Sequence, residues 1–65
     1  MLSDNIKKLR KKKGMSQDRL AKLADVTHTT LVKLESGANT NPTVKTLNKI
    51  ANALEISIDE LIKGK

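Results

Sequence analysis

Residues 16–37 read SQDRLAKLADVTHTTLVKLESG, and this stretch decides the fold. Ser16 and Thr27 are favourable helix N-caps, because a side-chain oxygen can accept a hydrogen bond from an unpaired backbone N–H of the first turn. Gly37 stands where a glycine commonly ends a helix. Apolar residues follow each cap at helical spacing, which predicts two short helices facing one core: Leu20, Ala21 and Ala24 in the first, Leu31 and Leu34 in the second.

Only Asp25 and Val26 are left to connect these two helices. So short a turn makes the helices cross sharply, and Val26 must fill the corner beneath it. The stretch is therefore a helix-turn-helix unit. The second helix has a mostly polar outer face, with small hydrogen-bonding groups and a single positive charge, which suits a nucleic-acid groove: His28, Thr29, Val32, Lys33 and Ser36.

Length and composition exclude several classes of protein. A chain of 65 residues makes one small domain, residues 1–65, and it has no cysteine and a single histidine, which excludes a disulfide framework and a metal cluster of the usual kind. We find no nucleophile–base pair, carboxylate dyad or glycine-rich phosphate loop, so we expect no enzyme activity, no cofactor and no small-molecule ligand. Without a signal peptide or a transmembrane span, the chain is expected to be intracellular and soluble.

The net charge of +6 is unevenly placed. Residues 1–37 hold nine Lys and Arg against four Asp and Glu, whereas residues 38–65 hold four against three. The basic run at residues 7–13 suits the negative end of a helix dipole and also attracts a phosphate backbone, and we expect it to do both. The chain has no aromatic residue, which disfavours a single-strand binder that stacks bases.

The rest of the chain predicts three more helices and no strand, hence an all-α fold of five helices. We expect Ser3 to cap a first helix that runs to about Lys13, with Gly14 ending it. Thr43 caps a fourth helix, and Ser57 with Glu60 forms a capping box that starts a fifth. In the first and fourth helices the apolar positions are expected to be core: Ile6, Leu9, Leu47, Ile50, Ala51 and Leu54. The fifth helix carries Ile58, Leu61 and Ile62, preceded by Ile56.

These motifs resemble the Cro/C1-type (XRE-like) helix-turn-helix regulators of bacteria and phages. The resemblance covers IKKLRKKKGMSQDRLAKLADVTHTTLVKLESG and NPTVKTLNKIANALEISIDELI, which is nearly the whole chain. It implies a five-helix, lambda-repressor-like domain that binds double-stranded DNA as a transcriptional regulator, a repressor of phage type or one controlling an operon, in the bacterial cytoplasm at the nucleoid. The chain departs from the family at Asp25, where Gly is usual, and in the neutral loop 38–43, which is often basic.

The resemblance also implies which residues contact DNA. Lys33 can donate to guanine O6 and N7, and threonine methyls can contact thymine. Val32 is either a thymine contact or an isolated surface aliphatic residue. The residues that match the family's base-reading positions are Thr27, His28, Thr29 and Lys33, with Val32 beside them, and Gln17 matches its phosphate clamp. From their own chemistry, Ser36, Asn39 and Asn41 can bond to a second stretch of the phosphate backbone, although Asn in such a loop often bonds only within its own turn.

Two further sets are structural. The family pairs an Arg and a Glu at the positions of Arg10 and Glu35, as a partly buried bridge between the first and third helices. The second set lies at and before the last helix: Ile56, Ile58, Leu61 and Ile62. These residues supply more apolar area than one short terminal helix needs, which predicts a homodimer surface. Alternatively, all four belong to the core of the monomer.

Two other function classes compete with DNA binding. A membrane-active basic peptide fits IKKLRKKK alone, but the helix-turn-helix spacing and the later capped helices argue against it. An antitoxin-type protein, which binds a partner protein and its own operator, usually needs chain beyond the DNA-binding domain. It is therefore the alternative to a regulator that acts as a dimer on an inverted repeat.

Overall fold

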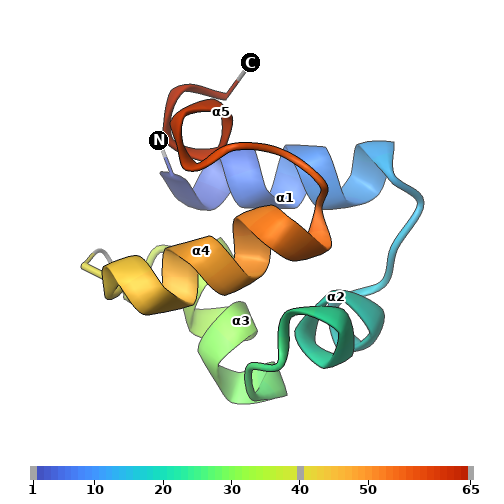
Figure 1. The fold of residues 1–65 in the computed structure, drawn as a ribbon. Coiled ribbons are helices and arrows are strands. Elements are labelled where there is room, and N and C mark those ends of the chain that lie inside the picture. The colour runs from blue at the N-terminus through green and yellow to red at the C-terminus, as the bar shows by residue number, and fades with distance from the viewer. Residues whose placement is uncertain (1, 40, 65) are drawn as a thin grey trace.

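The structure is a computed structural model that describes residues 2–39 and 41–64. Within these ranges it contains helices and no strand, which confirms the all-α prediction (Figure 1). None of the helices found there is long and apolar enough to cross a bilayer. The five helices are α1 (Leu2–Lys12), α2 (Gln17–Ala24), α3 (His28–Ser36), α4 (Val44–Ala53) and α5 (Ile58–Lys63).

Four helices begin at the predicted caps. The side-chain oxygens of Ser16, Thr27, Thr43 and Ser57 each accept a hydrogen bond from the backbone N–H three residues on, at 3.1 Å in every case. Before α5 the capping box is altered, because the Ser57 hydroxyl donates to Glu60 Oε1 at 3.5 Å. The first turns of these four helices are therefore fixed by local chemistry.

The predicted cap at Ser3 is wrong. α1 begins at Leu2, so Ser3 already lies in the first helical turn. Its side chain is half-buried, and its Oγ lies 3.9 Å from the position that a Cβ on Gly37 would take. Ser3 therefore belongs to the packing of α1 against the end of α3, a tertiary role that outweighs its local preference for capping.

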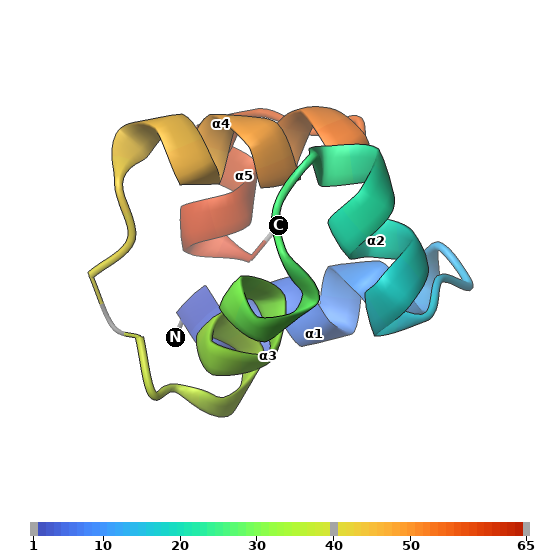
Figure 2. The same ribbon diagram turned by 90° about the horizontal axis from the view of Figure 1, so that it is seen from below.

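One aliphatic core joins all five helices. α1 packs against α3 and α5, while α4 packs against α2 and α5 (Figures 1 and 2). Leu47 and Val26 are only partly buried, and Val26 packs below the turn as predicted. The seven largest fully buried side chains come from every helix and from the end of α4: Ile6, Leu20, Leu31, Leu34, Ile50, Leu54 and Leu61.

Two turns place a residue other than glycine in the left-handed region. Asp25 has φ 58° at the end of α2, where its N–H donates to Lys22 O and the next N–H donates to Ala21 O at 3.0 Å. Lys49 of α4 supports this turn, because its Nζ donates to Asp25 O at 3.3 Å. Glu55 has φ 60° after α4, a feature that no sequence signal predicts. Both positions carry modest backbone strain.

The first and last helices are tied together by one side chain. Asn5 Nδ2 donates to Leu61 O at 3.1 Å and to Ile62 O at 2.8 Å. These are carbonyls of the final turn of α5, which have no partner within the helix. The start of α1 and the end of α5 consequently lie on the same side of the molecule (Figure 1).

Candidate nucleic-acid interface

The outer face of α3 presents the residues predicted to read bases. His28, Thr29 and Lys33 are exposed, and Val32 is 37% exposed. Leu31 and Leu34 turn inward and are buried. Seen from below, α2 and α3 lie on the side facing the viewer, with α5 behind them (Figure 2). The helix thus offers a row of polar groups on a side of the molecule that α1, α4 and α5 do not cover.

Thr27 differs from the other four candidates because its hydroxyl is already in use. Its Oγ1 accepts from the Thr30 N–H and donates to Thr30 Oγ1 at 2.8 Å. A hydroxyl has one hydrogen to donate. Thr27 therefore has only its methyl group and a remaining lone pair for a nucleic-acid contact, while its main task is to start α3.

Arg10 and Glu35 form the ion pair that the resemblance implied. Arg10 Nε lies 2.7 Å from Glu35 Oε2, and Nη2 lies 3.0 Å from Oε1, so the pair is bidentate. Arg10 Nη1 also donates to Met15 O at 2.7 Å. The side chains are 11% and 3% exposed, respectively. This pair fixes α3 to α1 and to the segment that leads into α2.

Gln17 extends this network toward α2. Its Nε2 donates to Glu35 Oε1 at 3.2 Å, so all three helices of the N-terminal half meet at one carboxylate. The amide nitrogen has a second hydrogen, and Gln17 is also the first residue of α2, where backbone N–H groups are unpaired. Its contact with Glu35 therefore orients Gln17 and leaves donors for an anion.

The three phosphate candidates at the end of α3 and in the loop after it are partly engaged in local hydrogen bonds. Ser36 Oγ donates to Lys33 O at 3.2 Å and accepts from the Ala38 N–H at 3.3 Å. Asn39 Oδ1 accepts from the Asn41 N–H at 3.1 Å. The Ser36 hydroxyl hydrogen is thus used locally. Among the described residues, the Asn39 side-chain NH₂ donates no hydrogen bond. Contacts of these residues with phosphate stay predictions.

The surface predicted for dimerisation is smaller than expected. Leu61 is 0% exposed, so it is a core residue and offers no area to a partner, which corrects its assignment to the interface. Ile56 and Ile58 are partly buried against the core, and Ile62 is 51% exposed. Three of the four residues therefore retain exposed apolar surface, and Ile62 is the most exposed of them.

One supporting residue was missed at the sequence level. Lys49 of α4 lies 3.9 Å from Asp25 Oδ2 in addition to its bond with the Asp25 carbonyl. It thereby links the turn between α2 and α3 to the helix behind it. Lys49 is separated from the turn by 24 positions, and nothing in the local pattern distinguishes it from the other lysines.

Comparison with known proteins places this geometry in a family. A family model described as "Helix-turn-helix" matches residues 6–61. The HTH-type transcriptional regulators YqaE and SinR of Bacillus subtilis are 38% and 35% identical over the whole chain, which spans 55% and 59% of their lengths.

Solved structures agree with this match. SinR in complex with DNA has a TM-score of 0.92 at 35% identity, covering 95% of this chain and 98% of that one. The P22 c2 repressor in complex with a synthetic operator has a TM-score of 0.87 at 28% identity, covering 100% and 97%. The likeness includes the helix-turn-helix and the five-helix arrangement around it, and the chain belongs to the Cro/C1-type helix-turn-helix family.

Proposed function

We propose that this chain binds double-stranded DNA at specific sequences and regulates transcription, as a dimer on an inverted repeat in the bacterial cytoplasm. The observation that carries the proposal is the exposed polar face of α3, held on the rest of the domain by the Arg10–Glu35 pair. The similarity to SinR and the P22 c2 repressor, both solved with DNA, supports it. The antitoxin alternative has no such support, since these relatives are named as regulators.

Base reading follows from the chemistry of the α3 face. Lys33 donates to guanine O6 or N7, and Thr29 and His28 offer hydrogen-bonding groups one turn earlier. Val32 lies between them with 37% of its surface exposed, enough for its methyl groups to meet a thymine methyl. Together these residues define a short stretch of sequence at one half-site.

Phosphate contacts fix the register of α3 in the groove. Gln17 stands at the start of α2, where the unpaired N–H groups and the helix dipole favour an anion. The exposed lysines of α1 add long-range attraction without reading sequence. We therefore expect Gln17 to orient the domain on the backbone and α3 to read the bases.

Replacing Lys33 with alanine is expected to weaken binding to the specific site by about 1–3 kcal/mol and to relax preference at one base pair. The reason is the loss of a donor to a base edge, which random DNA does not engage in the same way. Fluorescence anisotropy with specific and random duplexes at fixed salt measures the difference. Lys63→Ala on α5 is the control, because it removes the same charge far from α3. If Lys33→Ala weakened the affinity for the specific and the random duplex equally, Lys33 would be a phosphate contact.

The dimer follows from the size of the recognition helix. α3 has nine residues and spans about 14 Å, which covers one half-site and too few bases for operator-grade selectivity. A two-fold axis places a second α3 about 34 Å away, one turn along the same face of the DNA. The apolar surface around Ile62, with Ile56 and Ile58, supplies the contact.

Ile62→Lys is expected to shift the protein toward monomer in sedimentation equilibrium at micromolar concentration, because it places a charge in the proposed contact. Leu23→Lys is the matched control, since Leu23 is 53% exposed on α2 and Ile62 is 51% exposed. A wild-type protein that sediments as a monomer would exclude a dimer in solution. An unaffected dimer in Ile62→Lys would move the interface to another surface.

A further inference from the structure

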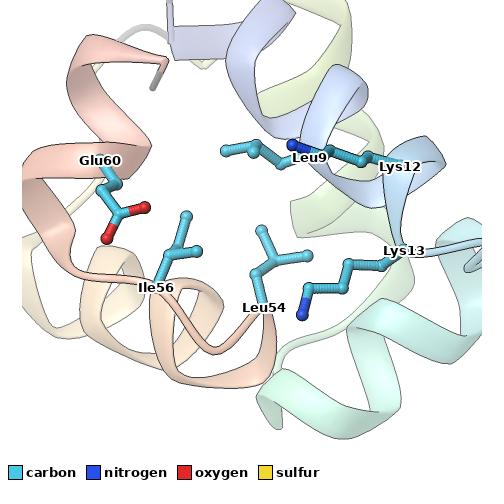
Figure 3. Close-up of a pocket in the computed structure, with 6 residues that line it drawn as sticks. All are labelled: Leu9, Lys12, Lys13, Leu54, Ile56 and Glu60. Carbon is cyan, nitrogen blue, oxygen red and sulfur yellow. The ribbon is translucent and has the colours of Figure 1, made fainter.

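A cavity opens on the molecule away from the recognition helix. It has a volume of about 420 Å³ and is formed by the second half of α1, the connection from α4 to α5, and α5 itself, with no residue from α2 or α3 (Figure 3). That volume falls in the range of about 300–1,000 Å³ in which proteins bind small ligands. The lining residues are Leu9, Lys12, Lys13, Leu54, Ile56 and Glu60.

The floor of this cavity is aliphatic. Leu9, Leu54 and Ile56 point into it from α1 and from the end of α4 (Figure 3). Leu54 is fully buried in the core, while Leu9 and Ile56 are partly buried and keep exposed surface at the cavity. No aromatic ring or polar side chain interrupts this floor, so it fits a flexible hydrocarbon chain better than a polar ring.

The rim carries charges of opposite sign that do not pair with each other. Lys12 ends α1 and Lys13 follows it, while Glu60 reaches in from α5 on the other side (Figure 3). Among the ion pairs of the described residues none contains these three side chains. Within residues 2–39 and 41–64, the side chain of Glu60 accepts one hydrogen bond, from the Ser57 hydroxyl at 3.5 Å. The ammonium groups are therefore available to an anion that enters from solvent.

We propose that this cavity binds a small aliphatic carboxylate. The hydrocarbon chain lies on the exposed parts of Leu9 and Ile56, above the buried Leu54, and the carboxylate lies between the ammonium groups of Lys12 and Lys13. Glu60 fixes the orientation of the ligand, because its carboxylate repels the ligand carboxylate from the α5 side of the cavity. A hydrogen-bond donor on the ligand can bind to Glu60 there. The occupied cavity leaves α3 uncovered, whereas Ile56 is shared with the proposed dimer contact, so the ligand competes with dimerisation and not directly with DNA.

Three eight-carbon probes separate the features of the site: octanoate, octylammonium and 8-aminooctanoate. In amide NMR titrations of the whole chain, octanoate is expected to shift the signals of Leu9, Leu54 and Ile56 in a saturable manner. Octylammonium, which has the same chain and the opposite charge, should shift them far less. 8-Aminooctanoate should bind at least as well as octanoate, because its ammonium group meets Glu60.

Variants of the rim complete the test. Lys12→Ala/Lys13→Ala is expected to weaken octanoate binding about tenfold, the sum of two exposed ion pairs. Lys7→Ala/Lys8→Ala is the matched control, because it removes the same charge from exposed positions of the same helix outside the cavity. Glu60→Gln should abolish any advantage of 8-aminooctanoate over octanoate.

Several results would overturn the proposal. One is an equal loss of octanoate affinity in both lysine variants, which would mean general attraction to a basic helix. Another is the absence of saturable shifts at the three floor residues. A third is binding of an acidic aliphatic peptide at this surface without binding of octanoate, which would make the cavity part of a protein interface. None of these results bears on DNA binding by α3, which is measured separately.

Discussion

Glu35→Gln will lower the free energy of unfolding by about 3–5 kcal/mol, because it leaves the Arg10 guanidinium without its counter-charge in a nearly buried site. Arg10 is 11% exposed and Glu35 is 3% exposed, so water cannot replace the lost partner. A domain of this size has a total stability of about 3–10 kcal/mol. The variant therefore loses a large part of this stability, and it is unfolded at room temperature if the wild type lies near the low end of the range.

Urea denaturation of the wild type and of Glu35→Gln measures this difference in the free energy of unfolding. Glu55→Gln is the control, since it makes the same substitution at an exposed position and should stay within about 0.5 kcal/mol of the wild type. The double variant Arg10→Met/Glu35→Leu should recover most of the loss, because neither charge is then left buried alone. An unchanged midpoint in Glu35→Gln would show that the pair contributes little to stability.

Leu61→Ala is expected to lower the free energy of unfolding by about 2–5 kcal/mol, the usual cost of removing a buried leucine side chain. Leu61 is the one buried residue of α5, a helix of six residues. The loss therefore falls on the contact that holds α5 to α1 and α4, and hydrogen exchange should show the α5 amides opening before those of α3.

Ile62→Ala provides the comparison on the same helix. Its side chain is 51% exposed, so the substitution should cost less than about 1 kcal/mol. Equal costs for the two variants would mean that α5 is not anchored through Leu61. The same burial explains why a charge at position 61 cannot test dimerisation, because it would disrupt the core of the monomer first.

The fold was largely predictable because its signals are local. Each capping side chain accepts a hydrogen bond from the N–H three residues later: Ser16, Thr27, Thr43 and Ser57. The spacing of the apolar residues after each cap then determines which face of the helix is buried. Ser3 was misread because Ser is equally compatible with a first helical turn, and its position is set by α3, far along the chain. The left-handed Glu55 was missed because Glu carries no preference for that conformation.

In the candidate site, too, the features that depend on local sequence were predictable and those that depend on packing were not. Exposure of His28, Thr29 and Lys33 follows from the helical period, which places them opposite the buried leucines. The Arg10–Glu35 pair came from family resemblance. The bonds from Gln17 to Glu35 and from Lys49 to Asp25 could not be predicted, because they depend on how whole helices pack. The cavity lined by Leu9 and Ile56 is likewise a product of packing.

The bonds between Asn5 and the last turn of α5 have a consequence for synthesis of the chain on the ribosome. They join residues 56 and 57 positions apart, and the core residue Leu61 lies in the same helix. Until α5 has left the exit tunnel, α1 lacks one of its two packing partners. At about 5–20 residues per second, synthesis of residues 46–65 takes one second or more, and throughout that time the nascent helices expose aliphatic surface to which a chaperone can bind.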